Sequence, residues 1–222
     1  MEKTLQRPAR LWKQRSIPLW IVIALSLLCL SGCAGSGKPQ YDVQKYLLTY
    51  PSPSFEASEK LPVSVKVNRF SIAAAYNSTG MIFRDDAYGL DAFNYSRWAV
   101  NPADMIGDLL LADMRAGNLF QAVLSRYDLE EGRFILSGGI EEFYLRAEKK
   151  NKVARIVLSI SLQDSAEKET GKRIMYQKTY TREMPLQDAS PKGYCAAASQ
   201  AMQNVSREIL RDVYAAVKTR AS

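Results

Sequence analysis

Hydrophobic and polar side chains alternate over several stretches of the chain, and this alternation predicts β-strands. In residues 61–70, three valines (Val63, Val65 and Val67) share one face, and polar residues occupy most of the positions between them. Successive side chains of a strand point to opposite faces. The segment is therefore predicted to be a half-buried strand.

The longest strand signals come in pairs and predict hairpins. Residues 134–148 and 153–164 are joined by a lysine-rich turn, and residues 174–183 continue the alternation after a second polar turn. Gly138 and Gly139, inside the first arm, predict a bulge or a close approach of another part of the chain. Shorter strands are predicted at 45–50, 81–84, 93–98 and 119–125.

Two segments instead have the helical spacing of three and four. Asn101 is a good N-cap, Pro102 suits the first helical position, and Gly117 is expected at the C′ position. A second helix is predicted from Pro191 to about Lys218. Its apolar stripe is Ala198, Ala201, Met202, Val205, Ile209, Val213 and Val217. The predicted fold class is α+β, a mostly antiparallel β-sheet with two main α-helices packed on one face.

The N-terminus follows neither pattern. A basic segment precedes an apolar run from Leu19 to Leu30 that is broken only by Ser26. A basic region followed by a short apolar region is typical of a secretory signal peptide. The run has 12 residues, whereas a helix needs about 20 to cross a bilayer. A permanent transmembrane anchor is therefore not expected.

The four residues Leu30-Ser31-Gly32-Cys33 resemble the lipobox of bacterial lipoproteins. The resemblance implies cleavage between Gly32 and Cys33 and attachment of lipid, such as palmitate, to Cys33. Two or more acyl chains hold a protein firmly in a membrane. The alternative is an ordinary signal peptide with a chance cysteine. Ala34 stands where an Asp usually retains a lipoprotein in the inner membrane, which favours the outer membrane, with the domain facing the periplasm.

The chain then divides into a lipoprotein signal peptide (1–32), a lipidated flexible tether (33–44) and a single α+β domain (45–222). The tether is small and polar, as flexible linkers are. Removing the signal leaves 190 residues, enough for one domain with a sizeable core.

Charge gives no sign of a nucleic-acid partner. The formal net charge is +7, and residues 1–32 carry five Lys or Arg and one Glu. The mature chain is therefore only about +3, without the clustered basic face that nucleic-acid binding requires.

Several kinds of catalysis are excluded by composition. The chain has no histidine, so Ser-His-Asp and Cys-His mechanisms and His-ligated metal sites are ruled out. With Cys29 removed and Cys33 lipidated, Cys195 has no intramolecular disulfide partner and is predicted to be a small buried residue. No metal site and no cofactor are expected.

Two acidic pairs are the remaining candidates for acid–base chemistry. They are Asp85-Asp86 and Glu141-Glu142. Adjacent residues of a strand point to opposite faces, so neither pair forms a dyad by itself. Both are interpreted as solvated charges, and the protein is predicted not to be an enzyme.

A cluster of aromatic residues with an arginine is the better functional signal, because these residue types concentrate at protein interfaces. The candidate partner-binding residues are Tyr88, Phe93, Tyr95, Arg97 and Trp98. The alternative is that Trp98 and Tyr95 cap the core beneath the first helix, and for Trp98 this alternative is favoured. Tyr88 and Phe93, near a predicted hairpin tip, are the stronger partner-facing candidates.

Three blocks of sequence together resemble a known family. They are Met81-Ile82-Phe83-Arg84, Tyr95-Ser96-Arg97-Trp98-Ala99, and Pro102 followed by a helix that ends near Gly117-Asn118-Leu119-Phe120. With the lipobox and the Tyr46-Leu47-Leu48 strand, they are similar to the ABC-type transport auxiliary lipoproteins, the PqiC-like family.

The resemblance implies a non-enzymatic outer-membrane lipoprotein. Such a protein works with an ABC transporter or an MCE-domain protein that carries lipids across the periplasm. It acts by docking a tunnel-forming or substrate-binding partner. The resemblance further implies a homo-oligomeric ring. One alternative is an envelope-assembly or synthase-activating lipoprotein. Another is a lipoprotein hydrolase, which the missing histidine weighs against.

Overall fold

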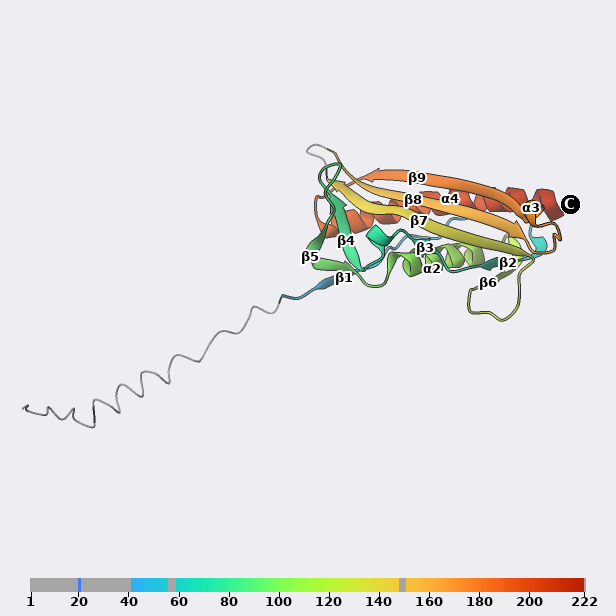
Figure 1. Ribbon diagram of the computed structural model, residues 1–222, viewed down its shortest axis with the longest axis horizontal. Helices are drawn as coiled ribbons and strands as arrows, with labels where there is room; N and C mark the ends of the chain where they lie inside the picture. The colour runs from blue at the N-terminus through green and yellow to red at the C-terminus, as the bar shows by residue number, and fades with distance from the viewer. Residues whose placement is uncertain (1–19, 21–40, 56–58, 148–150, 222) are drawn as a thin grey trace, which may run out of the picture. The chain divides into compact units, whose positions relative to one another are not determined.

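The computed structural model describes residue 20 and residues 41–55, 59–147 and 151–221 (Figure 1). Residues 42–222 form one compact unit, and all the elements below belong to it. The predicted signal peptide, Cys33 and most of the predicted tether lie outside the described residues.

The predicted strands and helices occur in the predicted order. The strands are β1 (Gln44–Tyr46), β2 (Leu61–Val67), β3 (Ser71–Ile72), β4 (Gly80–Arg84), β5 (Asp91–Trp98), β6 (Phe120–Leu124), β7 (Phe134–Ala147), β8 (Lys152–Asp164) and β9 (Ile174–Pro185). The helices are η2 (Ala74–Tyr76), α2 (Pro102–Ala116), α3 (Thr170–Arg173) and α4 (Pro191–Ala221). Of these elements, β3, η2 and α3 are short and additional to the prediction.

The predicted α+β class is confirmed, and the sheet is mixed. Its longest ladders, β7 with β8 and β8 with β9, are antiparallel, as is the β4–β5 hairpin. The shorter pairings of β1 with β5 and of β2 with β6 are parallel. Figure 1 shows α4 running along the long strands, and it contacts both β8 and β9.

Strand β7 organises the rest of the sheet. Three short strands pair with it in parallel and in sequence order: β2 beside Phe134–Leu136, β3 beside Gly139–Ile140, and β4 beside Leu145–Arg146. The segment from β2 to β4 is therefore one interrupted strand that follows β7 along its length.

The core lies between the sheet and the two long helices. The three valines of β2 are buried, and so are all seven residues of the predicted α4 stripe. They belong to one cluster with inward-facing residues of β7, β8 and α2. Apolar burial of this kind contributes about 25 cal/mol per Å² to stability.

At the two ends of α2, one predicted capping residue is confirmed and the other is wrong. The Asn101 side chain accepts a hydrogen bond from the Ala103 amide at 2.9 Å, so the predicted N-cap is confirmed. Gly117, however, is right-handed at φ −66° and ψ −18°, and Asn118 is the left-handed residue at φ 50°. The placement of Gly117 at C′ is therefore wrong by one residue. Asn tolerates this conformation better than most residues do.

The glycine pair in β7 permits a close approach. The register shift of β7 falls between Ile140 and Glu142, beyond the glycines. A Cβ atom at Gly138 would overlap the ring of Phe70. Of the two alternatives for this pair, the close approach is confirmed.

Candidate functional site

The five predicted partner-binding residues do not share one surface. Trp98 is only 1% exposed, and its ring centroid lies 5.1 Å from that of Phe143 and 5.4 Å from that of Tyr194. The partner-binding assignment of Trp98 is therefore corrected. Trp98, the last residue of β5, is a core residue, as the favoured alternative states.

The other four candidates remain at least partly accessible. Tyr95 is 48% exposed, Arg97 is half-buried, and Phe93 is half-buried against Phe83 with ring centroids 5.2 Å apart. Tyr88 is 97% exposed in the β4–β5 turn. The accessible candidates thus occupy β5 and the turn that precedes it.

The β4–β5 turn is held by Asp86. Its carboxylate accepts hydrogen bonds from the Gly89 amide and, at 2.7 Å, from the Tyr88 amide. These backbone bonds lower the pKa of Asp86. Asp86 of the first acidic pair is therefore an exposed turn residue. Its hydrogen bonds hold the loop that carries Tyr88.

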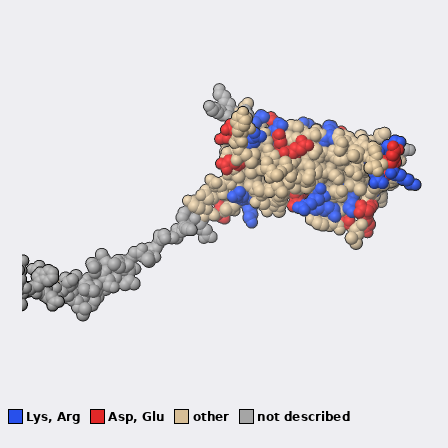
Figure 2. Space-filling model, viewed as in Figure 1, with Lys and Arg blue, Asp and Glu red and all other residues tan. Residues whose placement is uncertain are grey.

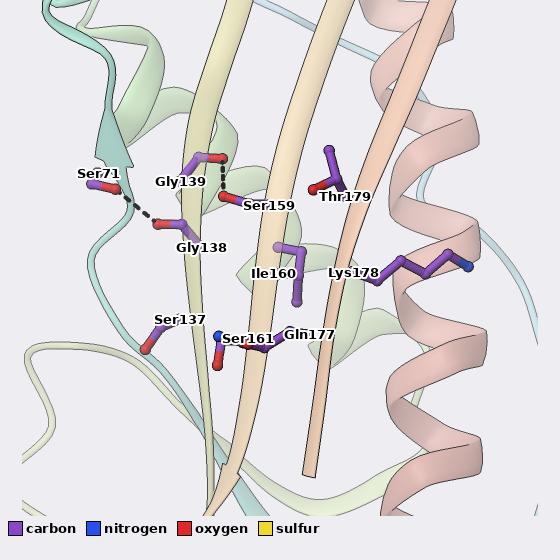
Figure 3. A pocket seen from close by; sticks show the side chains of 10 residues that line it. All are labelled: Ser71, Ser137, Gly138, Gly139, Ser159, Ile160, Ser161, Gln177, Lys178 and Thr179. Atoms are coloured by element: carbon purple, nitrogen blue, oxygen red, sulfur yellow. Dashed lines mark hydrogen bonds between the residues drawn. The ribbon is translucent and has the colours of Figure 1, made fainter. Parts of the chain in front are cut away.

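A shallow polar groove crosses the open face of the long strands (Figure 3). Its lining is dominated by small and hydroxyl-bearing residues: Ser71, Ser137, Gly138, Gly139, Ser159, Ile160, Ser161, Gln177, Lys178 and Thr179. Figure 2, seen from the side of Figure 1, shows few charged side chains over the middle of this face.

The groove lacks the groups that acid–base chemistry needs. Lys178 points away from it toward α4 (Figure 3), where its ammonium lies 2.6 Å from the Asp212 carboxylate. Ser71 and Ser159 donate hydrogen bonds to the carbonyl oxygens of Gly138 and Gly139. The lining contains no carboxylate, and no general acid or base faces the hydroxyl groups.

Glu142 of the second acidic pair belongs to an ion-pair cluster on β7, β8 and β9. Arg155 contacts both Glu142 and Glu183, and Arg146 donates two bonds to Glu183, at 2.8 and 2.9 Å. Burial alone would raise the pKa of Glu183, but Arg155 and Arg146 hold it below the usual range. Carboxylates paired in this way support the sheet and are poor general acids.

Cys195 is buried near the start of α4. Its thiol donates a hydrogen bond to the Leu47 carbonyl at 3.2 Å. Burial raises the pKa of the Cys195 thiol, which favours the unreactive protonated form. The prediction of a small packed residue is confirmed.

The structure also contains a cleft that the sequence did not indicate. It has a volume of about 500 Å³ and lies between the segment 46–51 and α4. The residues of α4 that line it follow helical spacing: Lys192, Cys195, Ala196, Ser199, Gln200 and Gln203. The other wall consists of Tyr46, Thr49, Tyr50 and Pro51.

Sequence reasoning missed this cleft because much of its lining is polar by residue type. Only the predicted 45–50 strand pointed to this region, and in the structure that strand is shorter, ending at Tyr46. Residues 47–51 instead run along α4, held by side chain to backbone hydrogen bonds. No periodic pattern encodes such contacts.

The described residues contain neither a metal centre nor a membrane-spanning helix. Within the described ranges, no group of Cys, Asp and Glu side chains is arranged to hold a metal ion. None of the helices in that part of the chain is long and apolar enough to cross a membrane.

The structure is thus a small α+β domain whose prominent surface features are the exposed residues of β5, the turn held by Asp86 and the cleft beside α4. The family model for the ABC-type transport auxiliary lipoprotein component matches residues 46–210. The chain belongs to this family, and it is an auxiliary lipoprotein component of ABC-type transport.

Solved structures show the same fold. A crystal structure of a protein from Xanthomonas campestris matches with a TM-score of 0.71 at 19% identity, covering 80% of this chain and 99% of that one. A hypothetical protein from Chlamydia trachomatis matches with a TM-score of 0.52 at 10% identity, covering 70% and 98% of the two chains. No curated protein matches significantly.

Proposed function

We propose that the protein is anchored through Cys33 in the outer membrane and faces the periplasm. There it acts as a non-enzymatic docking component of an ABC/MCE-type system that moves lipids between membranes. The observation that carries the proposal is the family match over residues 46–210, which begins thirteen positions after the cysteine of a lipobox-like sequence. The acyl chains hold the domain at the membrane, and residues 33–44 supply its reach.

The β5 surface is the proposed contact for the partner protein. It consists of Tyr88, Phe93, Tyr95 and Arg97, with Trp98 supporting the strand from within. Aromatic and arginine side chains dominate the binding energy of many interfaces. Because Asp86 fixes the turn, Tyr88 loses little conformational freedom on binding, which favours affinity.

The anchor is tested by mass spectrometry of the full-length protein purified from native membranes. The expected mature N-terminus is a lipidated Cys33, with cleavage after Gly32. A protein that retains its signal peptide, or that carries an unmodified Cys33 thiol, contradicts the proposal.

The partner is tested by affinity purification of the lipidated chain from its own membranes. MCE-domain and ABC-transporter components are expected to co-purify. Tyr88→Ala should weaken the complex by more than about tenfold and reduce their recovery accordingly, because truncating an interface hot spot costs about 2 kcal/mol or more. Tyr127→Ala is the matched control, since Tyr127 is also exposed but lies in the loop after β6.

The alternative is an envelope-assembly or synthase-activating lipoprotein. Recovery of a synthase in place of transporter components would favour it over lipid transport. The same purified sample, analysed by size-exclusion chromatography with light scattering, tests the proposed homo-oligomer. A monomer would contradict a ring-forming component.

A further inference from the structure

The cleft beside α4 presents a mainly apolar surface although many of its residues are polar. The Tyr50 hydroxyl donates to Asp113 at 2.9 Å. The Ser199 hydroxyl accepts from the Thr49 amide at 3.1 Å, and the Gln203 amide donates to a backbone carbonyl at 2.9 Å. These polar groups are already satisfied within the protein, so rings and methyl groups face the space.

A ligand in such a cleft must itself be largely apolar. A buried polar ligand group would lose its hydrogen bonds to water and find few replacements, which is unfavourable. The volume of about 500 Å³ lies within the range of ligand sites, roughly 300–1,000 Å³. The cleft is therefore suited to a hydrocarbon chain.

One cation lies at this cleft. Lys192 lines it from the first turn of α4. Its side chain is exposed, and it makes no ion pair with the acidic residues of the described segments. An ammonium next to an apolar space complements an amphiphile with an anionic head group, and the start of a helix adds a favourable dipole.

The cleft lies beside the first strand of the domain, which carries exposed apolar residues. Val43 and Leu47 are exposed on either side of β1, and the pairing of Gln44 with Ser96 places Val43 next to Tyr95. β1 begins at Gln44, eleven positions after Cys33, so this strand begins at most about 40 Å from the lipidated residue. The strand and the cleft beside it are thus within reach of a bilayer.

We propose that the cleft binds one acyl chain of a membrane phospholipid, with the lipid phosphate next to Lys192. The inference rests on the proposed membrane-anchored transport function and gives the domain a lipid site of its own. The intervening chain is a poor occupant, because residues 34–40 are small and polar. A phospholipid supplies both the apolar chain and the negative charge.

Photo-cross-linking in intact cells tests the site with the full lipidated protein. A photoreactive phenylalanine analogue replaces Gln200, which is exposed and lines the cleft. Mass spectrometry of the purified protein should show an adduct with the mass of a phospholipid. The same analogue at Gln121, exposed on β6, should give none.

Two variants distinguish the cleft from a nearby membrane surface. Ala196→Trp fills the cleft and should abolish the adduct at position 200, whereas Ala112→Trp, on the exposed side of α2, should leave it unchanged. Lys192→Glu should lower the adduct yield about fivefold, because an exposed ion pair contributes up to about 1 kcal/mol. Lys60→Glu is the matched control.

Each other outcome overturns the inference. A cross-link to the acyl chains of Cys33 would make the anchor itself the occupant, and a cross-link to a protein would make the cleft a protein interface. An adduct that persists in Ala196→Trp would place the lipid outside the cleft, and absence of any adduct would leave the cleft without a lipid. If transporter components still co-purify in these cases, only the lipid site is refuted.

Discussion

At the scale of single residues, Asp113 is a buried acid that contacts two other segments of the chain. It is 1% exposed on α2 and accepts hydrogen bonds from Tyr50 and from Ser206 of α4. Burial, followed by the Asp113 charge, raises the pKa of Tyr50 well above its ordinary value. The carboxylate therefore links α2, α4 and the segment that forms one wall of the cleft.

Asp113→Ala should lower the free energy of unfolding by about 2–4 kcal/mol, because two buried hydroxyl groups lose their acceptor. Tyr50→Phe should cost about 1 kcal/mol in the wild-type protein and less in the Asp113→Ala background. Urea unfolding followed by circular dichroism measures all four proteins. If the two substitutions change the unfolding free energy by strictly additive amounts, the hydrogen bond between Tyr50 and Asp113 is contradicted.

Gly138 provides a second test at the residue scale. Any Cβ at this position meets the Phe70 ring, so Gly138→Ala should destabilise the protein by about 1–3 kcal/mol through overpacking. Phe70→Leu should recover part of this loss in the double variant. Gly171→Ala is the control, since nothing lies within 4 Å of its added Cβ. Thermal unfolding that does not distinguish Gly138→Ala from Gly171→Ala would contradict the close approach.

At the scale of elements, the C-terminal end of α4 is tied to the end of β8. The Arg220 side chain donates to the Asp164 carboxylate at 3.1 Å, and Arg133 lies 3.6 Å from it. Burial alone would raise the pKa of Asp164, but the bond from Arg220, the Ala166 amide and Arg133 together lower it. The folded state therefore holds this carboxylate in its charged form more strongly than the unfolded state does.

The sign of the resulting pH dependence follows from that lowered pKa. The stability that Asp164 contributes is complete above its ordinary pKa of about 4, and it is lost as the pH falls through the lower folded-state value. Asp164→Asn should cost about 1–3 kcal/mol at pH 7, reduced by the partial exposure of both arginines. The unfolding free energy of Asp164→Asn should also fall less steeply than that of the wild type between about pH 5 and pH 3. Asp108→Asn, on the exposed surface of α2, is the control, and an unchanged slope in Asp164→Asn would refute the assignment.

Local signals were sufficient to predict the long strands and the two long helices. The alternation around Val65 and the stripe through Val205 each follow from one periodicity, and burying that stripe is what stabilises the element. The helix end was harder, because both Gly117 and Asn118 are suited to a left-handed residue. Only the packing of the chain decides between two adjacent candidates.

Pairing between strands could not be predicted in the same way. Alternation shows which face of β2, β3 or β4 is buried but not which strand lies beside it. The parallel alignment of these strands with β7 depends on contacts far apart in sequence. Trp98 illustrates the same limit at the candidate site, since an aromatic residue in an interface-like cluster and one in the core have the same local pattern.

The cleft was even harder to predict from the sequence than the strand pairing, because it exists only in the tertiary structure. Ser199 and Gln203 are polar in the sequence, and their side chains bond to the Thr49 amide and the Pro51 carbonyl only when the segment 46–51 lies against α4. No property of either segment alone indicates an apolar space. Sites of this kind are found from hydrogen-bond partners, because residue type does not reveal which polar atoms are already satisfied.

At the scale of the whole molecule, the position of the anchor decides where the domain acts. The 12 residues of the predicted tether span at most about 40 Å. A domain anchored through Cys33, as proposed, stays near the surface of the membrane that holds the anchor, and its partner must come to that surface. The membrane to which the lipoprotein is sorted therefore determines which partner it can dock.

Ala34→Asp should move the protein from the outer-membrane fraction to the inner-membrane fraction in a sucrose gradient, because Asp after the lipidated cysteine usually retains a lipoprotein in the inner membrane. Ala34→Ser is the matched control and should remain in the outer membrane. Residue 34 precedes the compact unit that begins at Asp42, so thermal unfolding of the domain should be the same in both variants. Recovery of a partner that reaches the outer membrane should then fall in Ala34→Asp alone, since a tether of about 40 Å confines the domain to the other membrane. Retention of Ala34→Asp in the outer membrane would refute the proposed sorting, and undiminished partner recovery from the inner membrane would refute docking at the outer membrane.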